Sequence, residues 1–305
     1  MYRLIINADD LGLSPGVNRA IKQAYTAGGI SSASIIVNTP YSRAAAEEIA
    51  LGLGLHVGLH LNLTHGRCVA DPRRMPLLVD EEGFFQRNAS ALFQALLFKH
   101  REREELLDQI AVELEAQMDM AEKLELRPTH FDSHQHVHMI PAIHKQLKKL
   151  APRHGYTRCR NTCEPFFCKR PVSQLGRACT NRNILKWLVI QHCRRHRDSY
   201  FTMPDLYFGL LSSSCARECD VRCFLRNARP GETLELGVHL GTGDSPEDTA
   251  YYKGVLDRFL NSGERLHELQ LVTGGAILHE LSRSGGRLIS FKDLEPQKTS
   301  RGDKE

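Results

Sequence analysis

The chain has 305 residues, of which 41% are hydrophobic and 25% are charged, a composition typical of a globular protein with a substantial core. Lysine and arginine (40) against aspartate and glutamate (36) leave a formal net charge of +4, spread along the sequence, which argues against a nucleic-acid-binding protein. No window approaches the roughly 20 apolar residues of a membrane span, and the start MYRLIINADDLG resembles neither a signal nor a transit peptide. We therefore expect a cytoplasmic protein with no membrane partner.

Strand and helix patterns alternate along the chain. The apolar run Leu4–Ile6 ends at paired carboxylates, as a buried parallel strand does, and Ser14-Pro15 then begins a helix. The period-two alternation over residues 55–62 predicts a strand with polar groups on one face. The strands that we expect cover residues 4–6, 33–37, 55–62, 129–139, 156–160, 200–203, 233–240 and 288–291. The helices that we expect follow these strands and include residues 15–27, 42–51, 106–121, 141–150, 184–196, 247–261 and 264–283.

Repeated strand-then-helix units predict parallel strands with right-handed crossovers. Seven or eight such units indicate an α/β fold, a (β/α) barrel of seven or eight parallel strands, with long loop insertions over residues 64–101 and 161–183. An open doubly wound sheet is the alternative, but it requires a glycine-rich phosphate turn after the first strand, which this sequence lacks. We expect one barrel domain over residues 1–294 and a polar, disordered tail over residues 295–305.

The segment THFDSHQHVHM, residues 129–139, is the most unusual part of the sequence. If it is extended, every second side chain from residue 130 to residue 138 points to one face, which gives four histidines and one aspartate there. Burying these groups without partners costs several kcal/mol each, whereas a metal site or catalytic cleft uses them as ligands and proton carriers. The segment therefore predicts a functional site.

Polar side chains end several of the predicted strands. They are Asp9, Asp10, His60, Asp132, His134 and His239. In a barrel the carboxyl ends of the strands meet at one mouth, so we expect these side chains to converge. Two imidazoles and a carboxylate form a common site for a divalent cation. Alternate strand residues are about 6.5 to 7 Å apart, so one cation can use at most two ligands from the histidine segment.

Three motifs in order are similar to those of one family, the YdjC-like carbohydrate deacetylases, which include diacetylchitobiose (chitooligosaccharide) deacetylases. They are NADDLG at residues 7–12, GLHLNLT at 58–64 and THFDSHQHVH at 129–138, and the likeness continues to ERLHEL at 264–269. The resemblance implies a metal-dependent hydrolase that removes acetyl groups from N-acetylated oligosaccharides.

The resemblance also implies roles for individual residues. It assigns the metal to Asp10, His60 and His134, the catalytic base to Asp9 and the general acid to His239. The family usually has Phe where this chain has Leu11, and its His-Pro-Gly appears here as His239-Leu240-Gly241. Family members favour Mg²⁺, whereas two imidazole ligands favour Zn²⁺. The other polar residues of the histidine segment, Asp132, His136 and His138, are expected to bind substrate or to support the ligands.

Two other functions are compatible with a barrel of this kind. Metal-dependent phosphoesterases and amidohydrolases often place His-x-His at the end of strand one, where this chain has Asp9-Asp10. A non-catalytic sugar-binding homologue would have lost the base or a ligand, and neither is lost here. The sequence leaves open the sugar, its length and the oligomeric state, although apolar residues in the two insertions are compatible with a homodimer.

Overall fold

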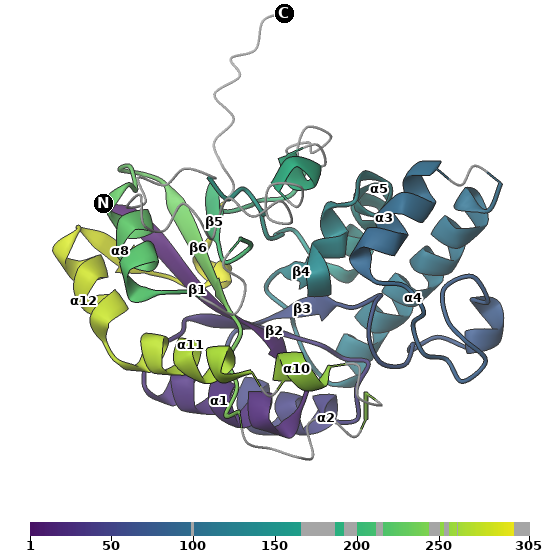
Figure 1. The fold of residues 1–305 in the computed structure, drawn as a ribbon, viewed down its shortest axis with the longest axis horizontal. Coiled ribbons are helices and arrows are strands. Elements are labelled where there is room, and N and C mark those ends of the chain that lie inside the picture. The colour runs from purple at the N-terminus through teal and green to yellow at the C-terminus, as the bar shows by residue number, and fades with distance from the viewer. Residues whose placement is uncertain are drawn as a thin grey trace, which may run out of the picture.

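The computed structural model describes residues 1–98, 101–165, 187–191, 200–211, 216–243, 251–252, 256–260 and 262–295. In these residues seven strands form one parallel sheet with helices packed around it (Figure 1). The strands are β1 (Tyr2–Leu11), β2 (Ser32–Ile35), β3 (Val57–Leu61), β4 (Phe131–Ser133), β5 (Leu206–Phe208), β6 (Thr233–Val238) and β7 (Gly286–Leu288). The α-helices are α1 (Pro15–Thr26), α2 (Ser42–Ala45), α3 (Ala89–Phe98), α4 (Arg103–Lys123), α5 (Pro141–Leu150), α8 (Glu218–Arg226), α10 (Asp257–Leu260), α11 (Gly263–Thr273) and α12 (Ala276–Arg283).

The strand order is β4-β3-β2-β1-β6-β5, and β1 lies at the centre. β7 pairs with the first residues of β1, Tyr2–Leu4, whereas β2 pairs with its last residues, Asn7–Leu11. Helices α3, α4 and α5 gather beside β3 and β4, and α1, α2 and α11 lie along the bottom of the sheet in this view (Figure 1). All strand pairs are parallel, so the carboxyl ends of the strands lie at one end of the sheet. No helix among the described residues is long and apolar enough to span a membrane.

The sheet curls toward a barrel, and the segment 158–163 lies between its two edge strands. Both backbone polar groups of Phe131 in β4 bond to this segment, at 3.1 Å each. On the other side, the Tyr207 N–H in β5 donates to the Cys163 carbonyl at 2.9 Å. Among the described residues, however, isolated bridges rather than ladders join this segment to β4 and to Thr202, and the Tyr207 hydrogen bond joins it to β5. The parallel α/β prediction is confirmed, whereas the strands form a curled sheet that is not fully closed.

Several predicted elements need correction. The strands expected over 156–160 and 200–203 are reduced to single bridges, and β5 begins at Leu206 instead. Pro204 has no N–H to donate, so the chain cannot continue as a paired strand from residue 202 to the start of β5. The helix expected over 264–283 is divided into α11 and α12 at Gly274-Gly275. The predicted insertion at 161–183 and the helix at 184–196 lie mostly outside the described residues.

The prediction of an extended histidine segment is wrong beyond residue 133. β4 ends at Ser133, and His134–Met139 form 3-10 helical turns in which Gln135 and His136 have left-handed φ angles of 55° and 57°. The Ser133 hydroxyl accepts a hydrogen bond from the His138 N–H at 2.9 Å and bonds to the His138 Nδ1 at 2.6 Å. These local bonds fold the chain back on itself, so alternate residues do not share one face.

A buried row of polar side chains on α4 holds the loop that follows β3. The row consists of Gln109, Glu113 and Gln117, which lie one helical turn apart. Gln117 exchanges two bonds with the Asn62 backbone (2.9 and 2.6 Å), Glu113 accepts from the N–H groups of Val69 and Ala70 (3.0 Å each), and Gln109 accepts from the Leu77 N–H (2.9 Å). The predicted insertion is thus anchored through its backbone.

Candidate active site

Asp9 and Asp10 reach the same cluster of side chains although they are consecutive residues at the end of β1. In a regular strand consecutive side chains point to opposite faces. Here the register between β1 and β2 shifts by one residue between Ala8 and Leu11, and Asp10 has a left-handed φ of 70°. Aspartate tolerates this conformation better than most residues. The resulting β-bulge turns both carboxylates toward the carboxyl end of the sheet.

The structure brings the three expected metal ligands together. Donor atoms of Asp10, His60 and His134 all lie within 4.8 Å of one another, and all three side chains are buried. The Asp10 Oδ1 lies 2.9 Å from the His134 Nδ1 and 3.4 Å from the His60 Nε2. Ligands about 2.1 Å from a tetrahedral cation are roughly 3.4 Å apart. Two imidazoles and a carboxylate at these separations therefore fit a divalent cation.

Charges around the cluster shift the pKa values of its members. Burial alone would raise the pKa of Asp10, but the nearby His134, His60 and Arg265 outweigh it and hold that pKa well below its usual range. Burial would lower the pKa of His60, but the charge of Asp132 and the hydrogen bond that His60 donates to Asp10 raise it to about 10. Without a cation, the His60 imidazolium therefore balances the carboxylates beside it.

Arg160 is the central cation of the site, and the sequence analysis missed it. Its terminal nitrogens lie 2.6 Å from each oxygen of Asp9 and 2.8 Å from the Asp132 Oδ2, and its Nε lies 2.7 Å from the Glu235 Oε1. The side chain is fully buried, and the three carboxylates outweigh the effect of burial and raise its pKa well above the usual value. Its position at the end of the predicted strand 156–160 was the available signal.

A second buried arginine, Arg265, supports the metal cluster and was also missed. Its guanidinium lies 3.2 Å from the Asp10 Oδ2, donates to the Leu240 carbonyl at 3.1 Å and lies 4.5 Å from the centre of the Phe259 ring. The Asp10 carboxylate therefore faces two imidazoles with one oxygen and a guanidinium with the other. The motif at residues 264–269 contains Arg265, but the motif served only as a mark of resemblance.

His239 lies beside Asp9 at the edge of the cluster. Its Nε2 is 3.9 Å from the Asp9 Oδ2, and its backbone N–H donates to Glu268 at 2.7 Å. Burial lowers the pKa of His239 to about 4, although the carboxylates of Asp9 and Asp10 oppose this shift. The imidazole is consequently neutral near pH 7.

The remaining residues of the histidine segment have different surroundings. Asp132 bonds to His60 through its Oδ1, at 2.8 Å, so it supports His60 without belonging to the group formed by Asp10, His60 and His134. His138 is buried against Ser133, and the His136 ring lies 5.8 Å from the Tyr207 ring. His130 stacks on Phe291 with ring centres 3.5 Å apart. His136 and His138 are thus placed outside the metal cluster.

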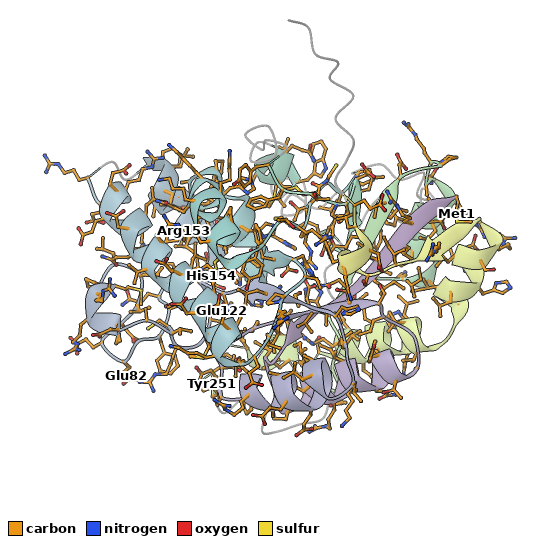
Figure 2. The ribbon with its side chains drawn as sticks, turned by 180° about the vertical axis from the view of Figure 1, so that it is seen from behind. Met1, Glu82, Glu122, Arg153, His154 and Tyr251 are labelled. Atoms are coloured by element: carbon orange, nitrogen blue, oxygen red, sulfur yellow. The ribbon has the colours of Figure 1, made fainter. Side chains whose placement is uncertain are left out.

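Two further groups of possible ligands are present among the described residues. Asp9, His60 and Asp132 form a buried group, in which Arg160 already bonds to both carboxylates, and the other group lies on the outer surface. Glu122 and His154 are seen together there (Figure 2), with the His154 Nδ1 2.8 Å from the Glu122 Oε1, and Asp119 is nearby. The two carboxylates are exposed. Exposed acidic groups commonly occur without an ion, so we assign these contacts to surface ion pairing.

Comparisons with known proteins agree with this geometry. A carbohydrate deacetylase of Geobacillus stearothermophilus is 39% identical over 95% of this chain and 97% of its own length, and the human carbohydrate deacetylase is 30% identical over 97% and 92%. A chitooligosaccharide deacetylase of Serratia marcescens is 40% identical over 50% of this chain and 56% of its own length.

The fold also has a solved counterpart. A crystal structure described as a putative cellobiose-phosphate cleavage protein from Enterococcus faecalis matches 96% of this chain and 98% of its own, with a TM-score of 0.70 and 22% identity. The model of the YdjC-like protein family matches residues 3–283, which include both aspartates and every histidine discussed above. The resemblance that the three motifs predicted is confirmed, and this chain belongs to the YdjC-like family.

Proposed function

We propose that this chain is a metal-dependent carbohydrate deacetylase, which hydrolyses the N-acetyl groups of acetylated oligosaccharides and releases acetate. One observation carries the proposal: a buried group of three metal donors lies next to a carboxylate and an imidazole, Asp9 and His239, that are 3.9 Å apart. Amide hydrolysis needs a proton acceptor and a proton donor at the same carbonyl. The names of the relatives supply the substrate class.

In this proposal Asp10, His60 and His134 would hold the cation. A bound divalent cation lowers the pKa of water and polarises a carbonyl group. The preference of the family favours Mg²⁺, and the two imidazole donors favour Zn²⁺. We also propose that the protein acts in the cytoplasm.

The proton transfers are assigned to two side chains. Asp9 takes a proton from the attacking water, and its two bonds to Arg160 fix the direction of its carboxylate. His239 delivers a proton to the departing amine. Because burial keeps this imidazole neutral at rest, the proton that it delivers is the one that Asp9 removed. One water and one amide thus give acetate and a free amino sugar.

The test is acetate release from a panel of N-acetylated oligosaccharides by metal-stripped protein, to which Mg²⁺, Zn²⁺ or another cation is added back. We expect no release without a cation and release with at least one. His134→Ala should lose both metal binding and acetate release, whereas His279→Ala, at an exposed position on α12, should retain both. Full activity of metal-stripped protein, or of His134→Ala, would contradict the proposal.

A further inference from the structure

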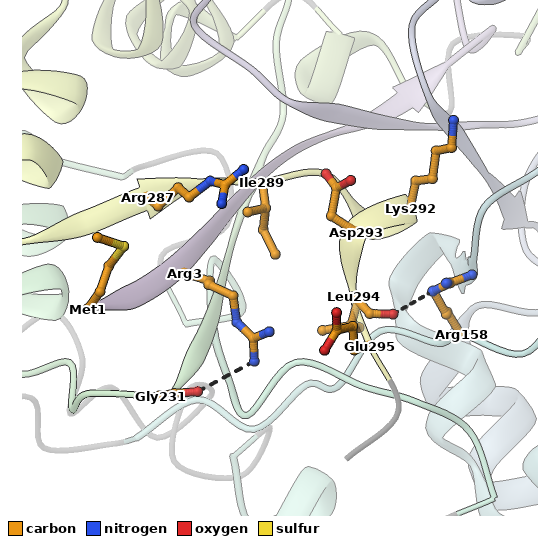
Figure 3. Close-up of a pocket in the computed structure, with 10 residues that line it drawn as sticks. All are labelled: Met1, Arg3, Arg158, Gly231, Arg287, Ile289, Lys292, Asp293, Leu294 and Glu295. Carbon is orange, nitrogen blue, oxygen red and sulfur yellow. Dashed lines mark hydrogen bonds between the residues drawn. The ribbon is translucent and has the colours of Figure 1, made fainter. Parts of the chain in front are cut away.

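A basic pocket lies beside the first residues of β1 (Figure 3). Its volume is about 750 Å³, within the range of small-molecule sites. The pocket is lined by Arg3 at the start of β1, whereas Asp10 lies at the end of the same strand, about 23 Å away at 3.3 Å per residue. Figure 2 likewise places Met1, which lines the pocket, far from Tyr251, which contacts the loop near His134. The pocket is therefore separate from the catalytic cluster.

Two arginines of this pocket are placed opposite each other on neighbouring strands. Arg3 in β1 and Arg287 in β7 are register partners in a parallel pair. Like charges directly opposite on paired strands destabilise a sheet. The Arg3 side chain has one long bond, 3.5 Å, to the Gly231 carbonyl, and no carboxylate among the described residues lies within ion-pair distance of either guanidinium. Asp293 interacts electrostatically with Arg287 without a contact at ion-pair distance, so the like-charge pair is only partly compensated and an anion between the two guanidinium groups would make it favourable.

The other charges of the pocket leave an excess of positive charge. Arg158 and Lys292 also line it, and Arg158 uses its Nε to bond the Leu294 carbonyl at 2.8 Å, which leaves its terminal nitrogens for another acceptor. Two carboxylates are present, Asp293 and Glu295, and the first of them already accepts two bonds from Ser290 at 2.9 Å. Four cations thus face two carboxylates, an excess that matches the charge of a phosphate dianion.

From this geometry we propose that the pocket binds a small phosphate monoester, with its phosphate between Arg3 and Arg287. Guanidinium groups bind phosphate through two parallel hydrogen bonds, which suits a paired arrangement of arginines. The exposed side chain of Met1 also lines the pocket and would contact the organic part of the ligand, whereas Ile289 and Leu294 are largely buried beneath it (Figure 3). The site does not depend on the deacetylase activity.

The proposal is tested by isothermal titration calorimetry of the metal-stripped full chain at fixed ionic strength. Stripping the metal removes phosphate binding to a cation at the other end of the sheet. The probes are adenosine monophosphate, inorganic phosphate and adenosine. We expect one molecule of the monophosphate per chain, weaker binding of inorganic phosphate and no binding of adenosine. The double substitution R3Q/R287Q should weaken binding of the monophosphate at least about tenfold, which corresponds to about 1.4 kcal/mol.

Two controls separate binding from folding and from net charge. In phosphate-free buffer the R3Q/R287Q variant should unfold at the same temperature as the wild type or higher, because the like-charge pair is gone. The variant R19Q/R74Q removes two exposed arginines elsewhere and should bind as the wild type does. The proposal is overturned by absent binding, by equal weakening in both variants, or by a lower unfolding temperature of R3Q/R287Q without phosphate.

Discussion

His60 and Asp132 are register partners on the neighbouring strands β3 and β4, and the Asp132 Oδ1 lies 2.8 Å from the His60 Nδ1. The carboxylate therefore occupies one ring nitrogen of His60 and leaves the Nε2 to face Asp10. The pairing of two strands fixes the tautomer and the orientation of the imidazole as a ligand.

The first prediction concerns this pair. Asp132→Asn preserves the size of the side chain but removes the charge that orients His60. Loss of such a partner typically weakens metal binding by about 10- to 100-fold. We expect this reduction in titration calorimetry with the activating cation. Asp119→Asn, at an exposed position, is the matched control and should leave the affinity unchanged; unaltered affinity of Asp132→Asn would refute the orienting role.

The second prediction separates the base from the metal ligands. Asp9→Asn should bind the cation with nearly normal affinity, because the proposed ligands Asp10, His60 and His134 form a donor group without Asp9. If the cation instead sat between Asp9, His60 and Asp132, the same substitution would weaken its binding. Turnover should fall by about 10² to 10⁴, the usual contribution of a general base. Acetate release and metal content, measured on the same sample, check both statements. A near-normal rate on acetylated chitooligosaccharides would show that another group accepts the proton.

The third prediction concerns the left-handed backbone of Asp10. Both Asp10→Gly and Asp10→Ala should lose the cation and leave the buried guanidinium of Arg265 without its carboxylate. Only alanine also pays for the φ of 70°, a cost of roughly 1–2 kcal/mol. Urea unfolding should therefore find Asp10→Ala less stable than Asp10→Gly by that amount. Equal stability of the two variants would mean that the bulge relaxes when the carboxylate is removed.

The fourth prediction concerns Arg160, which pairs with three buried carboxylates. Arg160→Met should destabilise the fold by about 3–5 kcal/mol, because it leaves buried charges without a partner. Chemical unfolding measures this cost. Arg153→Met, at an exposed position with one surface ion pair to Glu115, should cost less than about 1 kcal/mol. A small effect of Arg160→Met would mean that the carboxylates find other partners.

The fifth prediction is a pH dependence. Burial raises the pKa of Glu113 from 4.5 to about 6, against the hydrogen bonds from Gln117, Ala70 and Val69. The native state therefore holds this proton more tightly than the unfolded state does. As the pH rises from below 4.5 to above 6, the proton is lost and wild-type stability falls by up to about 2 kcal/mol. Relative to Glu113→Gln, wild type should become less stable across this window in urea unfolding. A pH-independent difference between the two would rule out this assignment.

Much of the fold could be predicted because buried parallel strands have a simple pattern. The apolar run that ends at Asp9 and the alternation around His60 correspond to β1 and β3. Near Pro204 the pattern was misleading, since pairing through isolated bridges leaves no periodic signal. The turn at Gln135 depends on the hydrogen bond that the His138 N–H donates to the Ser133 hydroxyl. Alternation of residue types does not reveal this bond, so it predicted an extended strand there.

The candidate site could be predicted only in part, for a related reason. Histidines and paired aspartates stand out in a sequence, and the structure places His60 and His134 beside Asp10. Arginines are common on surfaces, so the position of Arg160 at the end of a predicted strand and of Arg265 in a motif was a weak signal until their burial was known. The charges that neutralise a buried site are contributed by distant segments, and tertiary packing alone identifies them.

The polar row on α4 has a consequence for how this enzyme family could diversify. The row, which consists of Gln109, Glu113 and Gln117, forms hydrogen bonds with main-chain N–H and C=O groups of the loop. Every amino acid provides these groups, except that proline has no N–H. The exposed side chains along that loop can consequently change without releasing it from the helix, whereas Met75, Leu78 and Val79 are buried in the core. Members of the family can therefore vary the exposed surface of this loop by point mutation, while its attachment to α4 stays intact.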